Sequence, residues 1–119
     1  MRPIVPEFHV RAVQDGRVRI VAIEGELDIV TAPRLAAAVK DDDAFDALVF
    51  DLARMPFISS AGLRVIVVVH RRLARRGGGV ALVAATPFVA HILEIVGLTD
   101  ALPVAANVPA AIRLLTARA

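Results

Sequence analysis

The chain has 119 residues, 57% of them hydrophobic and 22% charged, a balance that suits one folded domain over residues 1–119 and excludes a disordered chain. The absence of cysteine excludes disulfides, iron–sulfur clusters, thiolate zinc sites and a cysteine nucleophile. The formal net charge is only +2, with 10 acids and 7 bases over residues 1–60 and 2 acids and 7 bases beyond, so charge alone indicates no nucleic-acid partner.

The N-terminal segment does not follow the pattern of an export signal. Residues 1–7 hold two prolines and a glutamate where a signal peptide carries its apolar stretch. No apolar run in the sequence approaches the roughly 18 residues that a membrane-spanning helix needs. We therefore expect a soluble, cytoplasmic protein with no membrane partner.

Two segments of alternating apolar and polar residues follow, over residues 8–13 and 18–23, with Asp15-Gly16 between them. Alternation with a period of two predicts strands, and Asp-Gly predicts a tight turn because glycine adopts a positive φ without steric cost. The chain is therefore expected to open with a β-hairpin.

Residues 25–33 are expected to form a loop that leads into a helix over residues 33–40, with Thr31 or Ala32 near its N-cap and Pro33 in its first turn. An acidic cluster ends this helix, and a nearly continuous apolar segment follows at residues 47–52. Such a run is typical of a strand covered on both faces, so we expect the central strand here. The acidic cluster comprises Asp41, Asp42, Asp43 and Asp46.

Residues 59–76 carry conflicting signals, because the β-branched run at residues 65–69 favours a strand whereas the spacing of apolar residues favours a helix. We predict a helix, since a β-branched residue costs about 0.5 kcal/mol in a helix while burying its side chain gains about 1.5–3 kcal/mol. The expected inward stripe consists of Leu63, Ile66, Val67, His70, Leu73 and Ala74. The remaining valines, Val65, Val68 and Val69, are assigned either to a contact with a neighbouring helix or to a docking patch.

The rest of the chain continues the alternation of strand and helix. We expect a turn at residues 77–79, a strand over residues 80–84, a helix that opens at residues 86–88 and ends at Gly97, and a short strand over residues 102–105. A final helix is expected from about Val108.

Apolar spacing also orients these last two helices. In the first, Phe88, Ile92 and Ile95 share one face; in the second, Ala111, Ile112 and Leu115 are expected to face inward. The resulting order, ββαβαβαβα, predicts an α/β fold with a mixed, mostly parallel sheet of four to five strands and about four helices.

Two hydroxyls, Ser59 and Ser60, stand where a helix is expected to follow the central strand. Unpaired backbone N–H groups and the helix dipole make such a position electropositive, so it favours an anion. A Ser-Ser pair at this place is, by itself, more often a simple N-cap.

The segment around these serines, residues 57–63 (FISSAGL), resembles the STAS domain, the family of bacterial anti-sigma factor antagonists. Residues 49–52 and 25–33 precede it in the order and at about the spacing of that family, so the likeness covers nearly the whole chain. The resemblance implies a STAS-like fold and a protein that binds an anti-sigma factor with serine kinase activity, frees the sigma factor, and is inactivated when that kinase phosphorylates one serine.

The family's acceptor is the serine two residues before the glycine, which maps onto Ser60, with Ser59 as the less favoured acceptor. Ser59 then stands at the family's usual Asp position, and Ala61 at that of its second Ser or Thr. The partner-binding residues that the resemblance implies are Glu26, Asp28, Thr31, Ser59, Ser60, Ala61, Gly62 and Arg64.

Enzyme and metal chemistry fit the sequence poorly. Ser60 and His70 lie about 15 Å apart along one predicted helix, and the sequence has no G-x-S-x-G motif, so we predict no catalytic residue. The three histidines, His9, His70 and His91, lack metal-ligand spacing. We expect no metal, no cofactor and no enzymatic activity.

Other partners remain as alternatives. Four arginines crowd one predicted helix end, where cations offset the dipole and no aromatic residue interleaves them, so we expect no direct contact with nucleic acid. They are Arg71, Arg72, Arg75 and Arg76. The chain is alternatively a STAS subunit, without a switch, of a lipid transporter or a signalling scaffold, which the serine at position 59 favours somewhat. In isolation we expect a monomer.

Overall fold

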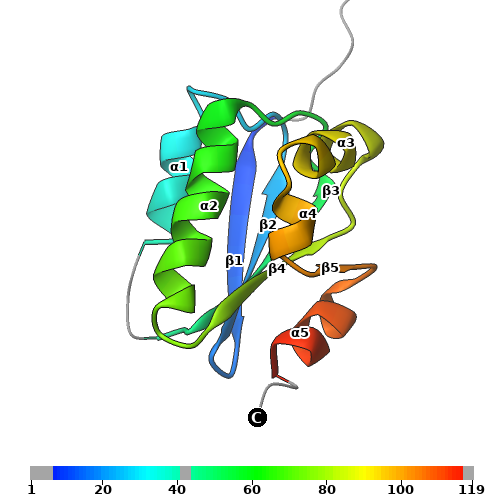
Figure 1. Ribbon diagram of the computed structural model, residues 1–119. Helices are drawn as coiled ribbons and strands as arrows, with labels where there is room; N and C mark the ends of the chain where they lie inside the picture. Colours follow the sequence, from blue (N-terminus) through cyan, green and yellow to red (C-terminus); the bar gives the residue numbers. More distant parts are fainter. Residues whose placement is uncertain (1–6, 41–43, 117–119) are drawn as a thin grey trace, which may run out of the picture.

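The computed structural model describes residues 7–40 and 44–116 and contains a five-stranded sheet flanked by helices (Figure 1). The strands are β1 (His9–Asp15), β2 (Val18–Glu24), β3 (Ala47–Arg54), β4 (Gly79–Val83) and β5 (Val104–Ala105). The helices are α1 (Ala32–Ala38), α2 (Ser60–Ala74), α3 (Pro87–Ile95), α4 (Leu98–Ala101) and α5 (Val108–Thr116). β1 pairs antiparallel with β2, and all other neighbours are parallel, in the order β1-β2-β3-β4-β5. The predicted fold class is confirmed.

The hairpin between β1 and β2 turns one residue later than Asp15-Gly16 predicts. Asp15 pairs with Val18, which leaves Gly16 and Arg17 as the two turn residues. Gly16 has a φ of +60°, as a hairpin turn with glycine at its first central position requires. Arg17 also bonds Asp46, with 2.9 Å between Nε and Oδ2, and so connects the turn to the start of β3.

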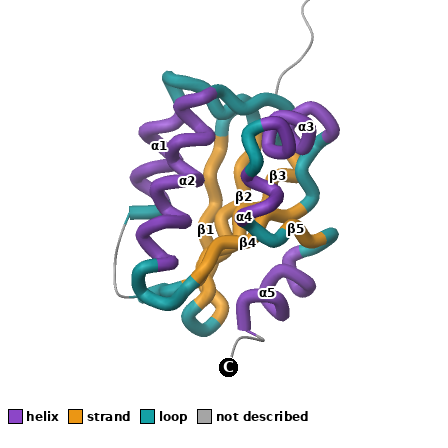
Figure 2. Tube along the Cα trace, in the orientation of Figure 1, coloured by secondary structure: helices purple, strands orange, loops and turns teal. Residues whose placement is uncertain are grey.

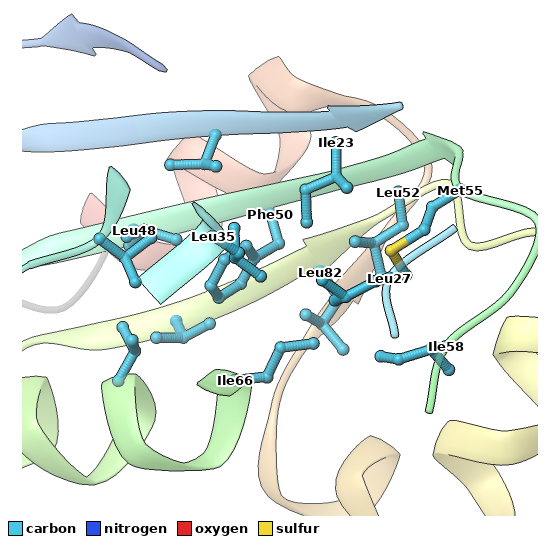
Figure 3. Close-up of a cluster of buried hydrophobic side chains, with 14 of the residues drawn as sticks. Ile23, Leu27, Leu35, Leu48, Phe50, Leu52, Met55, Ile58, Ile66 and Leu82 are labelled. Carbon is cyan, nitrogen blue, oxygen red and sulfur yellow. The ribbon is translucent and has the colours of Figure 1, made fainter. Parts of the chain in front are cut away.

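The sheet separates two apolar clusters, which explains the unbroken apolar run of β3. Leu48, Phe50 and Leu52 belong to the larger cluster, on the face that α1 and α2 cover (Figure 3). Ala47 and Val49 belong to the smaller cluster on the opposite face, beneath α5. Because alternate residues of a strand point to opposite faces, a central strand covered on both sides is apolar at nearly every position.

Residues 60–74 form a helix, as predicted, but its buried stripe is rotated from the expected one. The buried residues are Gly62, Ile66, Val69 and Leu73. Leu63, Val67 and His70 are only half-buried, and Ala74 is exposed. The stripe is centred near Gly62 because the absence of a side chain there lets the first turn of α2 pack closely against its neighbours.

The valines that the sequence leaves outside the stripe have three different environments. Val69 is buried, Val65 is half-buried against the core, and Val68 is 46% exposed. Together with Ala36 of α1 and its C-cap residue Val39, they line a hollow of about 200 Å³ between α1 and α2. The contact with a neighbouring helix therefore occurs in this run, and the docking patch stays a prediction.

The C-terminal half differs from the sequence prediction in three places. In α3, Phe88 and Ile95 of the predicted face point outward while Ile92 is half-buried against the core, and Val89 and Leu93 are the buried residues. A single-turn helix, α4, which the sequence did not predict, stands between α3 and β5. β5 has only two residues, whereas α5 begins at Val108 as expected, with Ala111 buried.

The end of α1 also falls earlier than predicted. The helix stops at Ala38, with Val39 as its C-cap, rather than at residue 40. Its N-cap is Thr31, one of the two expected residues. Asp41, Asp42 and Asp43 lie outside the described residues. Among the described ranges, no helix has the length and apolar character needed to cross a membrane.

Ala84, which directly follows β4, has a φ of +55°, a left-handed conformation that costs an alanine about 1–2 kcal/mol. We expect Ala84→Gly to raise the free energy of unfolding by about 0.5–1 kcal/mol, because the relief of strain exceeds the added entropy of the unfolded chain. Urea denaturation measures the change. Ala106→Gly, at an exposed loop position without a positive φ, is the control and should not stabilise the protein; equal gains in both variants would contradict the prediction.

Candidate functional site

Two loops at one end of the sheet lie side by side, one leading from β2 into α1 and the other from β3 into α2 (Figure 2). Leu27 and Ile58 form a parallel bridge between them. Leu27 N donates to Phe57 O at 3.0 Å, and Ser59 N donates to Leu27 O at 2.8 Å. A third bond, from Gly25 N to Arg54 O at 3.0 Å, fixes the base of the first loop. The two sequence segments that carry the family resemblance therefore meet in space.

Gly62 allows this close approach of the first loop to α2. A Cβ placed on Gly62 would lie 2.6 Å from Leu27 Cγ and 3.0 Å from Ile58 Cγ1. Leu27 is fully buried and Ile58 nearly so (Figure 3), so neither side chain has room to retreat. Gly62 thus has a structural role at the site.

Asp28 and Thr31 give the first loop its shape. Asp28 Oδ1 accepts hydrogen bonds from Val30 N at 2.9 Å and Thr31 N at 3.0 Å. The Thr31 hydroxyl accepts from Asp28 N at 2.9 Å and donates to Glu26 O at 2.8 Å. The bond from the Thr31 backbone is the main cause that holds the pKa of Asp28 below 3.8. Asp28 is therefore ionised at neutral pH, with Oδ1 committed to its own loop.

The two serines at the start of α2 occupy different environments. Ser59 is the N-cap: its backbone is extended, its side chain is half-buried, and its Oγ accepts from Gly62 N at 3.5 Å. Ser60 is the first helical residue and is exposed. Its hydroxyl makes no hydrogen bond to any residue in the described ranges. The two candidate acceptors are thus distinguished by geometry.

The remaining predicted site residues divide by exposure. Arg64, like Ser60, is exposed, and Gly62 is buried. The half-buried residues are Glu26, Asp28, Thr31, Ser59 and Ala61. All of them lie on the two adjacent loops or on the first five residues of α2, so the structure brings the whole predicted set to one end of the molecule.

Exposed apolar side chains surround this set, and the sequence analysis missed them. Ile29 and Val30, on the first loop, are each 78% exposed. Phe57, just before Ile58, stacks on Phe88 of α3 with ring centroids 5.8 Å apart. The sequence position of Ile29 and Val30 could have predicted this exposure. Both residues directly follow Asp28 in a segment predicted to be a loop, which offers no strand or helix face to bury them.

Within residues 7–40 and 44–116, no three histidine or acidic side chains form a group that could hold a metal ion. His70 lies on α2 ten residues beyond Ser60, and its Nδ1 is buried without a hydrogen-bond partner among these residues. Ser60 and His70 are therefore not brought together.

Comparison with known proteins relates this chain to STAS domains and anti-sigma factor antagonists. The family model described as STAS domain matches residues 9–111. BtrV of Bordetella bronchiseptica, named as a candidate anti-sigma factor antagonist, is 36% identical over 93 residues, which are 76% of this chain and 79% of BtrV.

Solved structures agree with this relationship. An anti-sigma factor antagonist from Mycobacterium paratuberculosis superposes with a TM-score of 0.82 at 27% identity, over 92% of this chain and 94% of the other. SpoIIAA in its unphosphorylated form gives a TM-score of 0.75 at 20% identity, over 91% and 95%. The phosphorylated form of Bacillus SpoIIAA gives 0.71 at 19% identity, over 91% and 99%. At these identities the SpoIIAA structures show the fold alone.

The packing at Gly62 generates a stability prediction. We expect Gly62→Ala to lower the free energy of unfolding by about 1–3 kcal/mol, because the added methyl overpacks the contact with Leu27. Chemical denaturation monitored by circular dichroism checks this. Ser60→Ala, two residues earlier in the same helix and exposed, is the control and should change stability by no more than about 0.5 kcal/mol. An unchanged stability of Gly62→Ala would contradict the close contact.

Proposed function

Because this chain belongs to the STAS domain family, we propose that it is an anti-sigma factor antagonist switched by phosphorylation of Ser60. In this proposal the unmodified protein binds an anti-sigma factor that is also a serine kinase, and the sigma factor is released. Phosphorylation of Ser60 by that kinase then ends the interaction. The protein is a regulatory substrate in the cytoplasm and not an enzyme. The names of BtrV and of the Mycobacterium paratuberculosis structure support the antagonist function.

The observation that carries the proposal is the free, exposed hydroxyl of Ser60. A kinase must reach the acceptor oxygen and remove its proton, and at Ser60 no hydrogen bond to the described residues has to be broken. Ser59 is a poorer acceptor, because its oxygen accepts the hydrogen bond from Gly62 N that caps α2. The difference favours Ser60.

The fold tolerates a phosphate at this position. Phosphoserine carries a charge of about −1.5 to −2, and a helix N-terminus stabilises negative charge through its free N–H groups and its dipole. α2 has no acidic residue in its first turn, so no carboxylate of that turn competes for those groups. Modification therefore changes the surface of the protein and leaves its fold intact.

The changed surface is the site where a partner would dock. Glu26 and Asp28 lie on the loop beside the start of α2, and Ile29 and Val30 project from the same loop. A partner that docks across both adjacent loops covers these apolar side chains together with Ser60, which is neutral before modification. A dianion there would have to be desolvated against two neighbouring carboxylates, at a cost of several kcal/mol.

Phosphorylation is tested directly with the purified 119-residue protein, ATP and a candidate anti-sigma factor of the serine kinase type. We expect one phosphate, which peptide mass spectrometry assigns to Ser60. Ser60→Ala should abolish incorporation, whereas Ser59→Ala should retain it, with α2 less stable by about 1 kcal/mol through loss of the cap. Phosphate on Ser59, or incorporation that persists in Ser60→Ala, would refute the assignment.

Binding is tested with the same anti-sigma factor by calorimetry. We expect Ser60→Asp to weaken the affinity at least about tenfold, which corresponds to 1.4 kcal/mol. Ser60→Asn, of the same size but neutral, separates charge from steric effects and should retain most of the affinity, as should Ser60→Ala. Full affinity in Ser60→Asp, or an equal loss in Ser60→Asn, would contradict the charge mechanism.

A further inference from the structure

We propose that Arg64 is the charge partner of phosphorylated Ser60, so that the modified serine is held by an ion pair within its own helix. The inference rests on the proposed function only in taking Ser60 as the modified residue. It concerns what the phosphate does once attached, and not which kinase attaches it.

The geometry of α2 brings these two side chains together. Ser60 and Arg64 are four residues apart in a helix of 15 residues, and both are exposed. Residues at i and i+4 lie on the same helix face, and each Cα–Cβ bond tilts toward the helix N-terminus, so a group attached to Ser60 is within reach of the long side chain of Arg64. An anion at i with a cation at i+4 is also the more favourable order of such a pair.

Arg64 is available for this role. Among the described residues it has no hydrogen bond, ion pair or ring contact, and its side chain borders the hollow between α1 and α2. Two arginines further along are differently placed: Arg72 of α2 donates to Val39 O, and Arg76, beyond the end of α2, donates through Nη2 to Phe45 O at 2.7 Å. Arg64 is therefore the arginine of α2 that is both one turn from Ser60 and uncommitted.

The charged groups around Ser60 favour an ion pair between a phosphate on Ser60 and Arg64. The first turn of α2 contains no acidic residue that would compete for Arg64. The carboxylates on the adjacent loop are Glu26 and Asp28, and Oδ1 of Asp28 already accepts the Val30 and Thr31 N–H groups. Both carboxylates repel a phosphate, whereas Arg64 attracts it.

An ion pair with Arg64 has a measurable effect on the phosphate. The second ionisation of phosphoserine has a pKa near 6, and a nearby cation lowers it by favouring the dianion. The dianion is then more fully formed at neutral pH. At the same time the guanidinium is withdrawn from any partner that approaches the hollow beside α2.

The experiment uses the full chain with phosphoserine installed at position 60 during translation, so that no kinase is needed. Phosphorus NMR titration gives the second pKa of the phosphate in the parent and in Arg64→Gln. We expect this pKa to rise by about 0.2–0.4 unit in Arg64→Gln, which corresponds to the usual strength of an i,i+4 ion pair. In 1 M NaCl, where the Debye length is about 3 Å, the difference between the two proteins should shrink.

Two further variants make the result specific. Arg71→Gln removes an exposed arginine of the same helix, about 16 Å from Ser60, and should leave the second pKa of the phosphate unchanged. Arg64→Lys keeps the positive charge, so its phosphate should have a second pKa close to that of the parent. The proposal is overturned if Arg64→Gln titrates like the parent, or if Arg71→Gln shifts the pKa equally. Either result would leave the kinase assay on Ser60 unaffected, so failure of this inference is distinguishable from failure of the proposed function.

Discussion

The arrangement of the site depends on one contact, between Leu27 on the loop after β2 and the first turn of α2. Backbone hydrogen bonds from Leu27 N to Phe57 O and from Ser59 N to Leu27 O hold the two loops in register. The absence of a side chain at Gly62 then lets the buried Leu27 pack against the helix. Without this contact, the loop that carries Asp28 and Thr31 would not be held against the start of α2, where Ser60 lies.

This contact also fixes where α2 begins, and the beginning of the helix differentiates two adjacent serines. Ser59 N is bonded to Leu27, so Ser59 keeps an extended backbone and its Oγ turns toward Gly62 N. Ser60, one residue later, has entered the helix and faces solvent. The two serines therefore differ because the helix begins between them. Ser59 caps the helix through its side chain, whereas Ser60 presents an accessible hydroxyl.

The surface around Ser60 combines groups that respond differently to added charge. Ile29, Val30 and the stacked Phe57 are exposed apolar groups, which gain from being covered by another protein. The same end of the molecule carries Glu26 and Asp28 on the adjacent loop and Arg64 one turn along α2. The free energy gained by burying these apolar side chains does not depend on charge. Burying a phosphate dianion with them adds a desolvation cost that opposes association. A small modification at the centre of such a surface is therefore well placed to control association.

By itself, the sequence determined what depends on near neighbours along the chain: a hairpin turn that includes Gly16, the alternation of strand and helix, the central strand at residues 47–52 and a helix start at Ser59 or Ser60. These follow from local backbone preferences and from side-chain periodicity. The tertiary structure decided the rotation of α2 toward Gly62, the outward face of Phe88 and Ile95, the extra turn α4 and the different environments of Ser59 and Ser60. The rotation of α2 and the outward face of α3 depend on partners distant in sequence, Leu27 for Gly62 and Phe57 for Phe88. Periodicity shows which residues share a helix face but not what that face contacts.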